Sequence, residues 1–130
     1  MGKANSMELS LREANECSYL EGSPDQVLMR SADDSTELVG ACFEQGVRKL
    51  LLYSENLTGK FFDLSSGEAG EVLQKLRNYN IQLAVVRAPD QHLSQYFKEL
   101  LIDEHQGPHF RLVEQRAEAE EWLCQVDSNR

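Results

Sequence analysis

The sequence is poor in cysteine. Its 130 residues contain three, Cys17, Cys42 and Cys124, an odd number with no C-x-x-C spacing. Each lies among apolar neighbours in a segment typical of a strand or a helix. Such cysteines are ordinarily buried, reduced thiols. We therefore predict that none of the three forms a disulfide or binds a metal.

The sequence also lacks the patterns that hold metals, phosphates or nucleophiles. A zinc site needs three or four converging ligands, and the histidines His92, His105 and His109 have no such spacing. The phosphate-binding motifs G-x-x-x-x-G-K-[ST] and G-x-G-x-x-G are absent, as is the G-x-S-x-G motif of nucleophilic serines. We expect no catalytic residue, no metal and no cofactor, and an enzyme is the less favoured interpretation.

Positive charge is scarce as well. The 13 Lys and Arg residues stand against 22 Asp and Glu, which gives a net charge of −9, and the Lys and Arg residues form no cluster. Nucleic acids and anionic membranes both attract proteins through their phosphate charge, so neither is an expected partner. No apolar run approaches the ~20 residues of a membrane span, and residues 1–10 lack the apolar segment of a signal peptide. We expect a cytoplasmic protein.

What the sequence does contain is a unit typical of α/β proteins. Residues 47–53 end in a continuous apolar run and residues 81–86 form a second one, with an amphipathic helix between them that is predicted to start at Ser65. Apolar runs of this kind occur in strands that are covered on both faces. Because a helix connects the two strands, we expect them to pair in parallel.

The flanking segments complete a single α/β domain over residues 7–126, between a disordered arm at 1–6 and a frayed tail at 127–130. The other elements predicted from the pattern are a hairpin over residues 7–20, helices over 34–45, 89–105 and 117–126, and a strand over 109–113. The predicted architecture is a mixed sheet of four or five strands with the hairpin at its edge and three or four helices packed against it.

Capping pairs mark two of the predicted helix starts. Asp34 with Glu37, and Ser65 with Glu68, have the spacing of a capping box, in which each side chain accepts a hydrogen bond from the backbone of the other residue. Both pairs directly precede an apolar helical stripe. We predict that Asp34 and Ser65 are the N-cap residues of their helices.

The loop and first turn around Ser65 hold three further features. Phe61 and Phe62 are too costly to leave in water, so we expect them to fill the core beneath the helix. Gly70 in the first turn costs up to ~1 kcal/mol relative to Ala. That cost predicts a close backbone approach at Gly70, either to Phe61 or Phe62 or to a partner.

The block FFDLSSGEAGEVLQKLRNYN carries a resemblance to a known family. It resembles an uncharacterised bacterial family, a domain of unknown function, whose core runs FFDL-x-x-G-x-AGE-x-LQK-x-x-NY. The similarity extends over residues 7–123, although Arg87 and Ala88 stand where the family has a Gly-Asp turn. No reaction is implied by this resemblance.

The segment Asp63-Leu64-Ser65-Ser66-Gly67 is similar, with Leu64 inserted, to the D-S-S-G segment of anti-sigma-factor antagonist (STAS-like) domains. In that family a strand precedes the segment, a helix and another strand follow it, and a partner kinase phosphorylates its first serine. The resemblance implies a STAS-like fold and makes Asp63, Ser65 and Ser66 the candidate regulatory residues.

We therefore predict a small regulatory module that acts through contacts with a protein partner. The expected contact surface consists of four residues at the start of the helix, Gly67, Glu68, Gly70 and Glu71. The identity of the partner and self-association into a homodimer stay open. The alternative is a ligand-binding or hydrolytic protein with a pocket near Phe61, Phe62 and Ser65.

Overall fold

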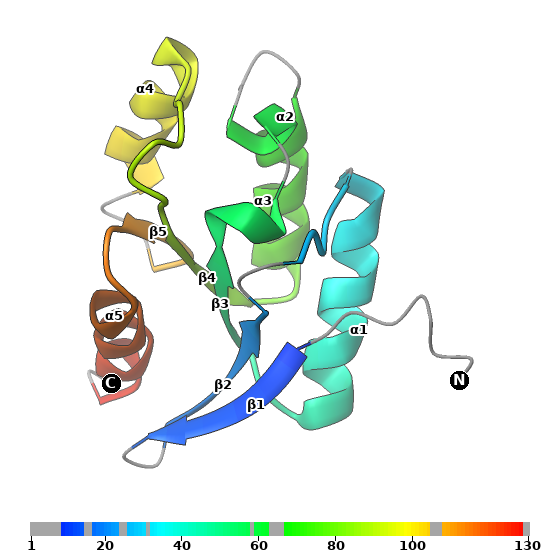
Figure 1. The fold of residues 1–130 in the computed structure, drawn as a ribbon. Coiled ribbons are helices and arrows are strands. Elements are labelled where there is room, and N and C mark those ends of the chain that lie inside the picture. Colours follow the sequence, from blue (N-terminus) through cyan, green and yellow to red (C-terminus); the bar gives the residue numbers. More distant parts are fainter. Residues whose placement is uncertain are drawn as a thin grey trace.

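The computed structural model describes residues 9–14, 17–23, 26–30, 32–57, 59–62, 67–104 and 108–128. The expected arm at residues 1–6 lies outside this part of the chain. The elements, in chain order, are β1 (Leu9–Ala14), β2 (Cys17–Gly22), η2 (Ala32–Asp34), α1 (Ser35–Gln45), β3 (Lys49–Tyr53), η3 (Ser54–Asn56), α2 (Gly59–Phe62), α3 (Glu68–Asn78), β4 (Gln82–Val86), α4 (Gln95–Glu104), β5 (Phe110–Val113) and α5 (Arg116–Ser128) (Figure 1).

The described strands form one mixed sheet in the order β1-β2-β3-β4-β5. β1 pairs with β2 antiparallel, whereas the pairs β2–β3, β3–β4 and β4–β5 are parallel. The register of the central pair joins Lys49 to Gln82 and Tyr53 to Val86. The predicted hairpin at the edge and the parallel pairing of the two apolar strands are both confirmed. α2 is a single turn of four residues, and the four longer helices match the expected number.

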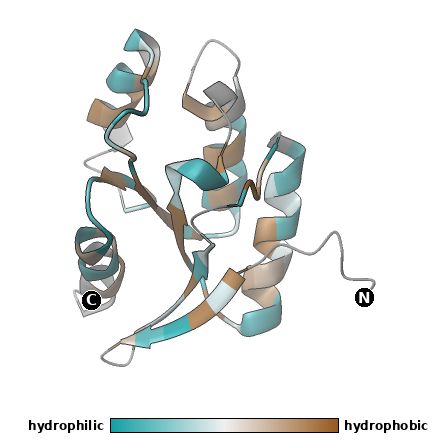
Figure 2. Ribbon diagram, in the orientation of Figure 1, coloured by the Kyte–Doolittle hydropathy of each residue, from teal (hydrophilic) through white to brown (hydrophobic). Residues whose placement is uncertain are grey.

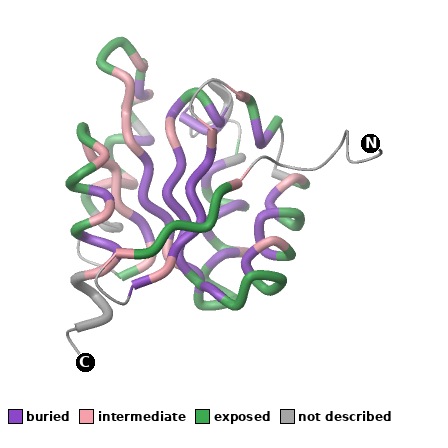
Figure 3. The backbone as a smooth tube through the Cα atoms, turned by 60° about the horizontal axis from the view of Figure 1, so that its bottom comes forward, coloured by how far each residue is buried: buried purple, intermediate pink, exposed green. Residues whose placement is uncertain are grey.

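Alternate residues of each strand point to opposite faces of the sheet, and the two faces carry separate clusters. Leu50, Leu52 and Leu83 pack in the larger cluster with residues of α1, α2, α3 and α4. Leu51 and Ala84 pack with α5. The central strands β3 and β4 are accordingly mostly apolar and buried, whereas β1 is largely exposed (Figures 2 and 3). α5 is thus the helix that covers the second face in the described part of the chain.

The boundaries of α1 match the prediction. α1 ends as expected, with Gly46 in the left-handed conformation at φ 71° and its N–H directed to the carbonyls of Cys42 and Phe43. At its start Asp34 occupies the N-cap position, as predicted, but its side chain makes no capping hydrogen bond and instead accepts one from the N–H of Arg30 at 2.8 Å. The predicted N-cap position of Asp34 is therefore confirmed, whereas the predicted hydrogen bond from its side chain to the backbone of α1 is absent.

The start of α4 differs from the prediction, which placed it at Pro89. The helix begins at Gln95, because Ser94 accepts a hydrogen bond from the N–H of Phe97 at 3.1 Å and so acts as its cap. The predicted strand over 109–113 and the last helix are confirmed, and α5 continues two residues beyond its expected end, to Ser128.

The prediction of three reduced thiols is wrong for two of them. Cys17 on β2 and Cys124 on α5 form a disulfide, with their Cα atoms 5.5 Å apart and a separation of 107 positions in sequence. The two cysteines meet because β2 and α5 pack on the same face of the sheet. Cys42 is buried and free, as predicted, and burial raises the pKa of its thiol to about 12.

Candidate functional site

The start of α3 was the predicted site, and the structure places it differently from the capping pattern. The helix begins at Glu68, and the N-cap position belongs to Gly67, which has φ 81° and makes no side-chain cap. The prediction that Ser65 is the N-cap residue is therefore wrong. Asp63, Ser65 and Ser66, the regulatory candidates, lie outside the described residues.

Phe61 and Phe62 lie in the core, as predicted. Both are fully buried on α2, with ring centroids 5.3 Å apart in an edge-to-face pair. The ring of Phe97 on α4 lies 5.8 Å from Phe61 and 5.5 Å from Phe62, and the ring of Phe110 on β5 lies 6.3 Å from Phe61. These four aromatic rings join α2, α4 and the sheet, so they anchor the chain just before the Ser65 segment.

Gly70 does not make the predicted close approach to Phe61 or Phe62. It is exposed in the first turn of α3, and a Cβ atom built on it would meet nothing within 4 Å. Gly67 and Glu71 beside it are exposed as well. The predicted approach of Gly70 to Phe61 or Phe62 is therefore wrong, whereas contact with a partner stays a prediction.

A buried carboxylate on the second face of the sheet is the most highly connected polar group among the described residues. Glu21 at the end of β2 is 7% exposed. Its carboxylate accepts hydrogen bonds from Arg12 Nε at 2.9 Å, from Arg116 at 2.9 and 3.1 Å and from the hydroxyl of Tyr53. Two cations therefore balance one buried charge, and β1, β2, β3 and α5 meet at this side chain.

Tyr19 extends this network along β2. Its hydroxyl donates to Glu120 of α5 at 2.7 Å and accepts from Arg116 at 2.8 Å. Arg116 at the first position of α5 thus contacts both Tyr19 and Glu21. Sequence reasoning missed these residues, although one signal was present: Cys17, Tyr19 and Glu21 alternate on a single strand face, and a carboxylate on a buried face requires a partner.

The network shifts the ionisation of its members in opposite directions. Burial opposes ionisation of Glu21, but hydrogen bonds from Arg116, Tyr53 and Arg12 outweigh burial and lower the pKa of Glu21 from 4.5 to about 2. Burial is the main reason that the pKa of Tyr19 and of Tyr53 rises to about 12. At neutral pH Glu21 is charged and both tyrosines are protonated, which is the state in which every hydrogen bond of the network is formed.

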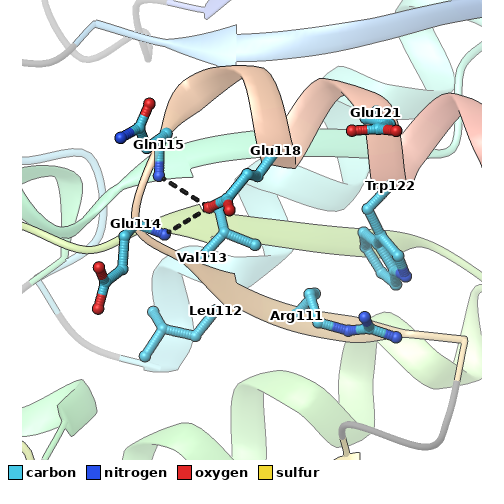
Figure 4. A pocket seen from close by; sticks show the side chains of 8 residues that line it. All are labelled: Arg111, Leu112, Val113, Glu114, Gln115, Glu118, Glu121 and Trp122. Atoms are coloured by element: carbon cyan, nitrogen blue, oxygen red, sulfur yellow. Dashed lines mark hydrogen bonds between the residues drawn. The ribbon is translucent and has the colours of Figure 1, made fainter.

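An open groove lies at the other side of α5, against the edge strand β5. It has a volume of about 550 Å³ and is lined by residues of β5, of the turn that follows and of α5: Arg111, Leu112, Val113, Glu114, Gln115, Glu118, Glu121 and Trp122 (Figure 4). Glu118 accepts hydrogen bonds from the backbone N–H groups of Glu114 and Gln115 at 3.2 Å each and so fixes the turn into α5. This groove is not the pocket that the alternative prediction placed near Phe61, Phe62 and Ser65.

Within the described ranges no three His, Cys, Asp or Glu side chains are grouped as metal ligands would be. No helix in those ranges combines the length and apolar character that crossing a bilayer requires.

Comparison with known proteins places the chain in a family. Residues 14–123 match the model of a domain of unknown function, DUF4180, and no curated protein matches the sequence. The expected membership of an uncharacterised family is confirmed, whereas the likeness to STAS-like domains stays a prediction. Because the match spans most of its length, the chain belongs to the DUF4180 family.

Proposed function

We propose that the protein is a small STAS-like regulatory module that binds a partner protein through the surface at the start of α3. The observation that carries the proposal is the surroundings of Gly70. A helical glycine costs up to ~1 kcal/mol relative to Ala, and here no described residue lies within 4 Å of a Cβ atom built on Gly70 to explain it. A glycine in that position leaves the backbone of the first turn open to a partner.

The proposed contact surface consists of Gly67, Glu68, Gly70 and Glu71. Gly67 has a backbone reason to be glycine, because φ 81° lies in the left-handed region. Gly70 has no such reason, since it lies inside α3. The two glycines and the exposed Glu71 give the partner a surface of low relief and negative charge.

Regulation is proposed to act through the segment just before this surface. By resemblance to STAS-like domains, Ser65 is the residue that a partner kinase would modify, with Asp63 and Ser66 beside it. A phosphate adds nearly two negative charges, next to an already acidic helix start. Phosphorylation of Ser65 would therefore change, through its charge, which partner surfaces can bind there. The packing of the hydrophobic core would stay the same.

The ligand-binding or hydrolytic alternative receives no support from the packing of Phe61 and Phe62. Both rings are covered by other aromatic rings of the core, so they do not form the wall of a pocket. A pocket for a small molecule needs an apolar concavity with convergent polar groups.

The test is capture of partners from the native host on immobilised protein, quantified by mass spectrometry. Gly70→Arg is compared with Gly40→Arg, since Gly40 is also exposed in a helix and its Cβ would likewise meet nothing within 4 Å. We expect a partner that is retained by the wild type and by Gly40→Arg and lost with Gly70→Arg. Equal retention by both variants would contradict the proposed surface.

The regulatory part is tested separately. Intact-mass measurement and phosphosite mapping of the native protein should find phosphate on Ser65, and Ser65→Asp should change partner retention while Ser65→Ala does not. If Ser65 carries no phosphate and the two variants behave alike, regulation at this segment is wrong even where the contact surface is right.

A further inference from the structure

We propose that the groove between β5 and α5 is a second docking site, which binds an extended basic segment of a partner protein as an added strand on β5. The site is separate from the start of α3 and is supported by different observations. The three observations are the outer edge of β5, the groove beside it and the negative charge of the groove.

The backbone of β5 is the first observation. β5 is the last strand in the sheet order, so one of its edges has no neighbouring strand among the described residues. The carbonyls of His109 and Val113 accept hydrogen bonds from Leu83 at 2.8 Å and from Arg87 at 2.8 Å. Because a parallel ladder uses alternate residues of a strand, the N–H and C=O of Leu112 face away from β4. An extended segment can pair with an edge of this kind.

The hollow beside this edge is the second observation. Its lining includes the consecutive residues 111–115, so the outer side of β5 and the following turn are open to it. The apolar residues that line it are Leu112, Val113 and Trp122. The guanidinium of Arg111 lies 5.1 Å from the centre of the Trp122 ring (Figure 4). Side chains of an added strand that point toward α5 would enter this space.

The third observation is the charge of the groove, which indicates what kind of segment would bind there. Three exposed carboxylates, those of Glu114, Glu118 and Glu121, line the groove, against the single cation Arg111. Complementary charge across an interface favours a partner segment rich in Lys or Arg. A second copy of this chain is a poor occupant, because pairing β5 with β5 would bring the two sets of carboxylates together, and the chain already carries a net charge of −9.

The test uses a fluorescein-labelled peptide of alternating lysine and threonine, with a glutamate and threonine peptide as its counterpart. Fluorescence anisotropy at physiological salt should show binding of the basic peptide alone. Glu121→Lys should weaken its binding about tenfold, whereas Glu44→Lys, the same charge change on exposed α1, should alter the affinity less than twofold. Gly70→Arg should leave it unchanged, so this proposal and the one at α3 can fail separately.

Hydrogen exchange supplies the structural readout. Saturation with the basic peptide should slow exchange of the Leu112 amide, as expected for a new strand on that edge. Equal weakening by Glu121→Lys and Glu44→Lys would show that the peptide senses only the overall charge and would overturn the proposal. Absence of binding, a Leu112 amide that the peptide does not protect, or a dimer that protects it without peptide would each overturn it as well.

Discussion

Replacing Glu21 by Gln tests whether the buried network holds α5 on the sheet. Gln has nearly the same shape but no charge, so the change removes the partner of two arginines while leaving the packing intact. Arg12 and Arg116 contact the Glu21 carboxylate from β1 and from α5. We therefore expect Glu21→Gln to destabilise the fold and to weaken the attachment of α5 in particular.

The size of the effect follows from the pKa of Glu21. A carboxylate whose pKa falls from 4.5 in the unfolded chain to about 2 in the folded one contributes about 3 kcal/mol at neutral pH. Removing one partner of a buried ion pair costs a similar ~3–5 kcal/mol. The arginine side chains are 54% and 41% exposed and can regain water, which reduces the penalty. We expect a loss of about 2–3 kcal/mol for Glu21→Gln at pH 7.

The pH dependence has a definite sign. Because the folded-state pKa is depressed, the contribution of Glu21 is fully present above pH 4.5 and is lost as pH falls toward 2. The wild type should thus lose stability between about pH 5 and pH 2, and Glu21→Gln should lack this part of the decline. The stability difference between the two proteins should shrink to below about 1 kcal/mol near pH 2.5.

Urea unfolding at several pH values measures these differences. The only tryptophan of the chain, Trp122, lies on α5, so its fluorescence reports on α5 while circular dichroism reports on the whole fold. Glu44→Gln, on the exposed side of α1, is the control and should change stability by less than about 0.5 kcal/mol. A loss below about 0.5 kcal/mol for Glu21→Gln, or a difference from the wild type that stays constant from pH 7 to pH 2.5, would refute the reasoning.

Three further predictions concern α3 and the disulfide. Gly70→Ala should stabilise the protein by about 0.5–1 kcal/mol in urea unfolding, because the new methyl group meets no atom; destabilisation would show that the site is crowded. Leu73→Ala, at a buried position of the same helix, should lower the free energy of unfolding by about 2–5 kcal/mol, whereas Gln74→Ala on the exposed side should change it by less than about 0.5 kcal/mol. Similar losses for both variants would contradict the assigned buried face of the helix. Reduction of the Cys17–Cys124 disulfide, which joins residues 107 apart, should lower the free energy of unfolding by about 2–5 kcal/mol. Thermal unfolding of the Cys17→Ser/Cys124→Ser variant should be insensitive to dithiothreitol, and a wild type that is equally insensitive would show that the disulfide is not formed.

The fold class and the central pairing could be predicted because their signals are local and redundant. The run 50–52 and the run 83–86 are apolar without interruption, as strands covered on both faces must be. The stripe of Val72, Leu73 and Leu76 repeats at helical spacing and is buried as a set. Each of these elements is specified by several residues at once, so no single competing contact could displace it.

The helix starts and the polar site could not be predicted in the same way. A capping pair rests on two side chains, and although Asp34 holds the predicted N-cap position, its side chain accepts from the N–H of Arg30 instead of capping α1. The network around Glu21 joins residues 95 apart in sequence, Glu21 and Arg116, and the disulfide joins residues 107 apart. These pairs form only because α5 covers the second face of the sheet. The sequence near Glu21, Arg116 or the two cysteines does not indicate which face α5 covers.

The disulfide also bears on the expected cytoplasmic location, which stays a prediction. Disulfides persist mainly in oxidising compartments and are rare in the cytosol. Thiol counting on protein taken from the native host under denaturing, acid-quenched conditions distinguishes the two states, since only Cys42 is free when the disulfide is intact. Three free thiols would indicate a reducing compartment, in which α5 is held by its noncovalent contacts alone.

The polar contacts between α5 and the sheet lie mainly at β2 and β3. Arg116 contacts Glu21 and Tyr19 on β2, and Lys49 at the start of β3 donates to the carbonyl of Leu123 at 2.8 Å. Together with the disulfide, these attachments run to β2 and β3, whereas on the β5 side Trp122 stacks with Arg111. A segment added to β5 could therefore displace Arg111 from Trp122 without breaking the attachments of α5. Binding in the groove should accordingly change Trp122 fluorescence while leaving the stability contributed by Glu21 intact.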